Sequence, residues 1–436
     1  MRLLAKAWAA VFVLGALTAR AADLAPGQVL DATTAGGAAD LLAPEVLAHY
    51  QAGDYRNTVA AWPSTPAWDA GFIAATSKNA GAYDVSDEGT IVDAKTHAPA
   101  RGIYGLPFRI DPGDPKAGVK AIWNAYYASW RLGSLHDVLA LDWVAKRGLE
   151  RQAALESHML FYEGIAPGTG PKENPLDLAT QSLGVVTSPA DLNGTASLSW
   201  RFRDAGKRDQ AWTYVPALRR VRQVSPANRS DGFLGSDLSQ DDGAFFDGKP
   251  EDFTWKLIGE RTAYVLADPK SLTGQATRRA RPDGGIDEEW PPEQKVVGYQ
   301  DPDWKGVAWA PVAPVRVPRK LWIVEARAKD PYYLFDRIEL GLDQETFQGA
   351  ASRKFDAQGQ LLRSLEFLTY ASAPLTSGSE TVVLPASSMG YILAENTKAG
   401  RATVTGTALP GKSVHERRVP IDPAVFALER LGTTGK

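Results

Sequence analysis

The sequence contains no cysteine in its 436 residues. A chain without cysteine forms neither disulfide bonds nor thiolate metal sites. It also lacks the residue through which bacterial lipoproteins are acylated, so we expect that it is not a lipoprotein. Stability must therefore come from a hydrophobic core. The 44% hydrophobic and 23% charged residues are ordinary values for a folded globular chain of this length.

Long apolar runs are equally scarce. The run Ala7–Leu17 follows Arg2 and Lys6 and precedes Thr18-Ala19-Arg20-Ala21. This order predicts a secretory signal at residues 1–21, cleaved after Ala21, and export to the periplasm. A retained membrane anchor is the alternative, but the run is shorter than the ~20 apolar residues that span a bilayer. No other segment approaches this apolar length, so we expect a chain that does not span a membrane.

Charge and motifs give little support for several function classes. The net charge of −3 gives no reason to expect nucleic acid binding. The segment Gly406–Ser413 has the spacing of a phosphate-binding loop, but the residues after it do not form an amphipathic helix before Pro420. We therefore predict no cofactor. No metal site is predicted either, because no two of the five histidines have a ligand spacing: His49, His97, His136, His158 and His415.

The first part of the chain predicts mainly loops and two helices. Residues 22–103 form a loop-rich region, with one short helix over Leu41–Tyr50 that ends at Gly53. A stronger helix follows, with Asp114 as its N-cap and Pro115 as its first residue. Its bulky stripe recurs at helical spacing and must be buried: Val119, Ile122, Trp123, Tyr126, Tyr127 and Trp130.

From about Thr195 onward, apolar and polar residues alternate with the period of two that is typical of strands. The stretch Arg281–Arg319 carries seven prolines, so we expect a long surface excursion there. The segment Pro423–Leu431 reads as a short final helix. These patterns predict a mainly β (α+β) fold built on an antiparallel sheet. The predicted strands lie within 198–203, 212–219, 252–258, 262–266, 321–326, 335–342, 351–355 and 361–370.

Aromatic strand residues are the candidates for lining a cavity or filling the core. Only one face of each strand can line a cavity, and the sequence leaves open which residues do so. The candidates are Trp200, Phe202, Trp212, Tyr214, Trp255 and Trp322.

Charged residues follow one of these aromatic strands. The basic residues Arg219, Arg220 and Arg222 come first, and the acidic residues Asp237, Asp241 and Asp242 come next. Guanidinium groups pair with carboxylates, which favours an internal Arg–Asp network. The alternative is that the arginines bind an anionic group, such as a lipid headgroup, at a cavity mouth.

The region Trp212–Asp242 resembles a stretch of outer-membrane lipoprotein-sorting-like proteins. More fully, the chain resembles the envelope family known as domain of unknown function 1329, over roughly Tyr104–Ile392. The other segments that carry the resemblance are Tyr104–Phe108, Ala121–Asn124, Phe253–Gly259, Arg319–Ala326, Phe355–Gly359 and Ser388–Ile392.

The resemblance implies a strongly curved antiparallel sheet, or half-open β-barrel, with a few helices packed on its concave side. This LolA/LolB-like domain would span residues 104–436, including the Pro-rich excursion at 281–319. Such a shape implies an apolar trough, and hence a periplasmic carrier or binder of a hydrophobic or amphiphilic ligand such as a lipid or acyl chain.

Two other functions stay open. The family accompanies RND-type exporters and outer-membrane proteins, so a non-catalytic scaffold for such an exporter is one alternative. An envelope hydrolase that uses paired carboxylates is the other, with candidates in Asp237, Asp241, Asp242 and Asp287–Glu289. Without a nucleophile motif or a metal site, we expect that the protein is not an enzyme.

Overall fold

The computed structural model describes residues 24–434 except 65–67, 244, 274–276, 290–294, 378–379, 386–390, 408 and 410–413. The predicted signal at residues 1–21 lies outside the described residues. Across the described chain, no helix combines the length and the apolar character needed to cross a membrane.

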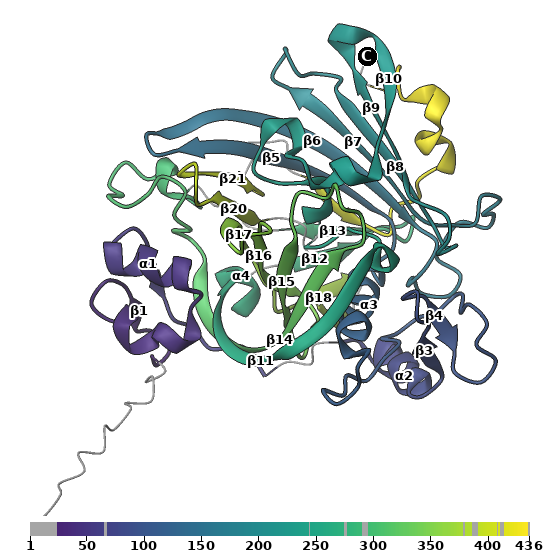
Figure 1. Ribbon diagram of the computed structural model, residues 1–436, viewed down its shortest axis with the longest axis horizontal. Coiled ribbons are helices and arrows are strands. Elements are labelled where there is room, and N and C mark those ends of the chain that lie inside the picture. Colours follow the sequence, from purple (N-terminus) through teal and green to yellow (C-terminus); the bar gives the residue numbers. More distant parts are fainter. Residues whose placement is uncertain are drawn as a thin grey trace, which may run out of the picture.

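A large, strongly curved antiparallel sheet dominates the molecule (Figure 1). No pairing among the described residues joins its end strands β10 and β11, so the sheet is half-open rather than closed, and the predicted fold class is confirmed. The strands follow one another in the order β11 (Phe253–Ala267), β14 (Val315–Ala328), β15 (Arg337–Asp343), β16 (Gly349–Phe355), β17 (Leu361–Phe367), β20 (Ile392–Asn396), β21 (Arg401–Thr405), β5 (Leu135–Ala145), β6 (Gly148–Phe161), β7 (Leu178–Ser188), β8 (Ala196–Phe202), β9 (Gln210–Val215) and β10 (Arg220–Val224).

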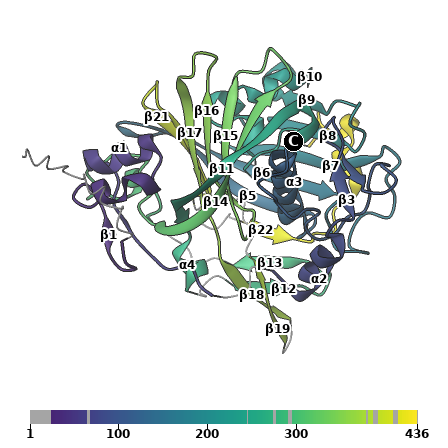
Figure 2. The same cartoon turned by 60° about the horizontal axis from the view of Figure 1, so that its bottom comes forward.

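A smaller branch of strands extends from the start of β5 and lies at the lower edge of Figure 2. Its members are β22 (Val414–Arg417), β13 (Ile286–Glu289), β12 (Thr277–Ala280), β18 (Ser372–Ser377) and β19 (Glu380–Pro385). The predicted excursion at 281–319 thus contains β13 and the start of β14. Strand β13 has no proline. Pro318 is in register with Tyr264 of β11 but lies outside the part of β14 that pairs with β15, so it removes no donor from the β14–β15 ladder.

Helix α3 (Ala117–Trp130) packs on the concave side of the sheet against β11 and β14 (Figure 1). Gly118 permits this close approach, because a Cβ there would lie 2.8 Å from the backbone nitrogen of Leu257. The bulky stripe is buried as predicted. The predicted start was wrong: Asp114 accepts from the backbone N–H of Lys116 and binds Lys120, and the helix begins only at Ala117.

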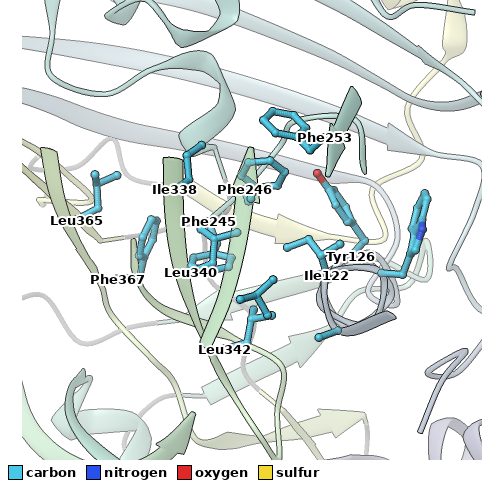
Figure 3. Packing of buried hydrophobic residues seen from close by; sticks show 14 of the residues in the cluster. Ile122, Tyr126, Phe245, Phe246, Phe253, Ile338, Leu340, Leu342, Leu365 and Phe367 are labelled. Carbon is cyan, nitrogen blue, oxygen red and sulfur yellow. The ribbon is translucent and has the colours of Figure 1, made fainter. Parts of the chain in front are cut away.

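Figure 3 shows how the space between α3 and the sheet is filled. Phe245 and Phe246, from the loop before β11, lie between Ile122 and Tyr126 of the helix and the leucines of β15. The aromatic rings of Phe246 and Phe253 meet edge to face, with centroids 5.2 Å apart. This half of the concave side is therefore packed core.

The N-terminal region holds more structure than predicted. The predicted short helix is confirmed as α1 (Pro44–Ala52), and Gly53 ends it with a φ of 79°. A second helix, α2 (Ala70–Asn79), was missed because Gly71 and the β-branched residues weaken its pattern. Short two-stranded sheets accompany them, β1 (Val29–Leu30) with β2 (Asn57–Thr58) and β3 (Tyr83–Val85) with β4 (Ile91–Asp93).

The C-terminal segment covers the convex face of the sheet. It consists of two 3₁₀ turns, Pro423–Phe426 and Leu428–Arg430, rather than the predicted helix, because Ala427 is extended between them. Phe426 and Leu431 are buried against side chains of β6 to β9. The sheet is thus covered on both faces in this region.

Candidate functional site

A cavity of about 210 Å³ lies on the concave side of β5 to β8, beneath the loop over residues 229–243. Its walls are mainly apolar. The apolar lining comprises Leu139, Leu141, Leu155, Met159, Leu238 and Ile392. An apolar cavity of about 150 Å³ accommodates benzene, so this cavity has room for part of an alkyl chain.

Small residues in register create the space. Ser157, Gly184 and Ser197 face one another across β6, β7 and β8. In the neighbouring row, Ser182 and Ser199 are directly opposite, and their hydroxyl oxygens lie 2.7 Å apart. Each hydroxyl thus has a partner on the sheet. On the other face of the same strands, the side chains are large and are buried under the C-terminal segment. The small side chains therefore lie only on the face toward the cavity.

A second cavity of about 100 Å³ adjoins the first, between α3 and the sheet. Both cavities are lined by Met159, Asp247 and Ile392. Phe245 and Phe246, seen beside α3 in Figure 3, border the second cavity. Together the two cavities form an apolar trough between β5–β8 and the helix.

Buried charges fix the loop over the trough. Arg229 Nε lies 2.6 Å from Asp241 Oδ1, and its NH2 lies 2.9 Å from Asp247 Oδ2. Tyr333 donates its hydroxyl to the other oxygen of Asp241 at 2.8 Å. Burial acts to lower the pKa of Arg229, but the charges of Asp241 and Asp247 outweigh burial and raise the pKa. Arg229 is therefore a permanent cation at the edge of the trough.

The acidic residues singled out in the sequence do form an ion-pair network, but with different cations. Asp237 pairs with Arg401 and Arg363, at 3.0 and 3.3 Å. Asp242 binds the ammonium group of Lys354 and accepts from Ser239. The predicted partners Arg219, Arg220 and Arg222 are instead exposed, at and beside the outermost strand β10.

Three of the six candidate aromatic residues lie on the convex face. Trp200 and Trp212 pack with ring centroids 4.8 Å apart, and Trp200 Nε1 donates to the carbonyl of Phe426 at 3.1 Å. Tyr214 belongs to the same cluster under the C-terminal segment. Their alternation with Ser197 and Ser199 places them on the opposite side of the sheet from the trough. These three residues are core, and the prediction that they line a cavity is not supported by their position.

The other three candidates also lie outside the trough. Trp255 and Trp322 pack on the concave side against the core beside α3. Phe202 is buried, with the ammonium nitrogen of Lys207 3.5 Å from its ring centroid. None of the six is among the described residues that line the two adjoining cavities.

The strand wall of the larger cavity comes largely from β5, β6 and β7, which the sequence analysis missed. Strand β5 is buried on both faces from Leu139 to Val144, so it shows no alternation. The sequence signal that could have revealed the hairpin of β5 and β6 is the turn Lys146-Arg147-Gly148. In the structure, Gly148 takes a φ of 124° at this turn.

The fold and the trough define a class: a half-open β-sheet protein with an internal apolar pocket. Residues 29–408 match the family described as "protein of unknown function (DUF1329)", and the chain belongs to this family. The resemblance inferred from the sequence is thereby confirmed.

One curated relative is an uncharacterised protein of Pseudomonas aeruginosa, 23% identical over 266 residues. The match covers 58% of this chain and 51% of the relative, so the chain spans about half the length of that protein.

Three solved structures are similar to this chain at low sequence identity. A DUF1329 family protein from Desulfovibrio piger is 18% identical, with 74% of this chain and 99% of that chain covered and a TM-score of 0.46. A domain described as an outer membrane lipoprotein-sorting protein, from Vibrio parahaemolyticus, is 14% identical, with 73% and 100% covered and a TM-score of 0.45. A LolA superfamily protein from Nitrosomonas europaea is 12% identical, with 70% and 96% covered and a TM-score of 0.36.

Proposed function

We propose that this protein is a non-catalytic carrier or binder of a hydrophobic or amphiphilic ligand in the periplasm. The observation that carries the proposal is the trough of two adjoining cavities, of about 210 and 100 Å³, lined by aliphatic and aromatic side chains. A preformed apolar pocket with a few polar groups at its edge is the usual form of a small-molecule site.

The energetics suit a lipid or acyl chain. Each buried methylene contributes about 0.8 kcal/mol, so about six buried methylenes contribute about 5 kcal/mol before the cost of immobilising the chain. Affinity of this size needs no charged contact. Arg229, at the edge of the larger cavity, is already paired with Asp241 and Asp247, so the proposal does not depend on a charged headgroup contact there.

The state of the acidic residues supports a binding role over a hydrolase. Hydrolysis by paired carboxylates requires one acid that is free to give up a proton and another that is free to attack or to activate water. Here Asp237, Asp241 and Asp242 are each bound to a basic side chain. Glu288, from the other predicted acidic group, is bound to Arg278 and Arg417.

The decisive experiment adds a large side chain to a strand residue that lines the larger cavity and so reduces the space for a ligand. In Gly184→Leu, an added Cβ lies 3.5 Å from Leu155 Cδ1, an ordinary contact, and the rest of the side chain projects into the larger cavity. Thr187→Leu makes the same kind of addition at an exposed position of the same strand and serves as the control. The measurement is fluorescence titration with N-phenyl-1-naphthylamine, followed by displacement of this probe with palmitate.

We expect saturable probe binding by the native protein and by Thr187→Leu, and binding at least tenfold weaker by Gly184→Leu. Native mass spectrometry of protein prepared gently from periplasm should show a co-purifying lipid in the first two proteins only. Equal probe binding by all three proteins, or no saturable binding by any, would overturn the proposal. Docking to an RND-type exporter stays a prediction from the family resemblance.

A further inference from the structure

The pairing of β5 with β6 brings together two histidines that are 22 residues apart in the sequence. His136 is directly opposite His158 in the ladder. Their rings are stacked, with centroids 4.4 Å apart and planes at 2°. The neighbouring odd-numbered residues Met159 and Ser157 line the trough, so the two histidines lie on the convex face. This pair is therefore separate from the proposed ligand site.

Glu156 completes a group of three donors. Its Oε1 lies 3.0 Å from His136 Nε2 and 3.2 Å from His158 Nε2. All three ligand atoms lie within 4.8 Å of one another. In a tetrahedral zinc site with bonds of about 2.0–2.1 Å, neighbouring ligand atoms are about 3.3 Å apart. Both separations from Glu156 already match this value, and the two rings would have to tilt out of their stacked arrangement for both nitrogens to face one ion.

A second carboxylate orients one of the histidines. Glu416, from β22, places its Oε2 2.6 Å from His136 Nδ1. The other oxygen of Glu416 is held by Arg281. Metal-binding histidines characteristically donate the second ring N–H to a carboxylate, which fixes the ring and leaves the other nitrogen for the metal. The contacts of His136 follow this arrangement.

The solvent exposure and the charge of this group of side chains also suit the binding of a metal cation. The side chains of His136, His158 and Glu156 are 19%, 23% and 36% exposed, so an ion and its water can reach them. With neutral histidines, the carboxylates of Glu156 and Glu416 outweigh the single charge of Arg281. The site therefore attracts a cation. Imidazole donors favour zinc, nickel and copper(II) over magnesium and calcium, and the absence of thiolates disfavours copper(I).

We propose that His136 Nε2, His158 Nε2 and Glu156 form a binding site for a divalent transition-metal ion of the zinc class, with water as the remaining ligand. The sequence predicted no metal site, because no two histidines have a ligand spacing along the chain. The proposal differs from that prediction because the register of β5 and β6 places His136 opposite His158. The site links β5 to β6 directly and, through Glu416, to β22. The inference stands independently of the ligand that the trough binds.

The test uses the full-length protein stripped with a chelator. Zn²⁺ binding is measured by competition with a chromophoric chelator, and Co²⁺ serves as a spectroscopic probe through its visible absorption. We expect one ion per chain. His158→Gln and Glu156→Gln should each bind at least tenfold more weakly, and Glu416→Gln about 10–100-fold more weakly, as is usual for orienting groups. The matched control, His97→Gln at an exposed position, should bind normally.

Two further readouts separate a metal site from an ion-pair cluster. Because protons compete with the metal for imidazole nitrogen, affinity should fall as the pH falls toward about 5. Zn²⁺ should raise the melting temperature of the native protein and of His97→Gln but not that of His158→Gln. The lack of stoichiometric binding of Zn²⁺, Co²⁺ and Ni²⁺, or equal binding by His158→Gln, Glu156→Gln and the native protein, would overturn the proposal.

Discussion

Lys354 shows how single buried charges hold the cover of the trough in place. Its side chain, on β16, is only 2% exposed. The ammonium group binds Asp242, lies 3.1 Å from Ser239 Oγ and is 4.6 Å from the centroid of the Phe335 ring. The loop that closes the larger cavity is thereby tied to the opposite half of the sheet.

Replacing Lys354 with a neutral residue should lower the free energy of unfolding. In Lys354→Met the carboxylate of Asp242 remains buried without its cation, a situation that typically costs about 3–5 kcal/mol. We expect a loss of this size in the free energy of urea unfolding. The double variant Lys354→Met/Asp242→Asn should regain at least half of it, since no buried charge is left. A single variant that loses less than about 1 kcal/mol would refute this account.

At the scale of single residues, the sequence predicted the kind of interaction but not the partners. Asp237, Asp241 and Asp242 were expected to be in ion pairs, and they are. Local spacing suggested the nearby arginines, whereas Arg363, Arg401 and Lys354 come from strands that follow more than 100 residues later. Pairs this distant depend on strand order, which composition and spacing do not reveal.

Among the secondary-structure elements, α1 contacts the sheet through several polar side chains, and one of them is a histidine. His49 Nε2 lies 2.8 Å from Glu395 Oε2 on β20, and its Nδ1 lies 3.0 Å from Asp54 Oδ2. The ring also stacks on Tyr55, with centroids 4.5 Å apart. Burial acts to lower the pKa of His49, but hydrogen bonds to Glu395 and Asp54 and their charges raise it to about 9.

This raised pKa makes the attachment pH-dependent. An unfolded histidine titrates near about 6.5, so the stabilisation is fully present below that pH and is lost as the pH rises through about 9. We expect the melting temperature of His49→Gln to lie furthest below that of the native protein at about pH 6, with the difference shrinking as the pH rises from about 6.5 to about 9 and constant above that. The exposed variant His97→Gln provides the control. A difference that does not change with pH would contradict the assignment.

Helices and strands whose apolar residues recur at a clear period could be predicted from the sequence. Those without such a period could not. The aromatic stripe of α3 and the alternating β8 and β9 were recognised because their large apolar residues recur at the period of a helix or a strand. Strand β5, buried on both sides, and α2, with a glycine in its first turn, gave no such signal. The strand wall of the larger cavity lies largely on β5, β6 and β7, so this part of the candidate site was missed with them.

For the molecule as a whole, the alternation of apolar and polar residues leaves open which face of the sheet borders the apolar trough. The alternation is equally consistent with a cavity lining and with a packed core for three aromatic residues, Trp200, Trp212 and Tyr214. The deciding feature is the return of the chain's last described residues to the convex face, where Phe426 is fully buried. This covering turns the large side chains into core and leaves the small ones, on the other face, to form the trough.

The variant Phe426→Ala tests this division of the two faces. Truncation of a buried phenylalanine typically costs about 3–5 kcal/mol, part of which we expect as local release of the C-terminal segment. Trp200 and Trp212 would then meet water, so the tryptophan emission of the folded protein should shift to longer wavelength. Binding of N-phenyl-1-naphthylamine in the trough should change less than about twofold, because among the described residues the trough lining shares only Leu183 with the hydrophobic cluster around Phe426. A large loss of probe binding without unfolding would instead place the ligand on the convex face, among the tryptophans.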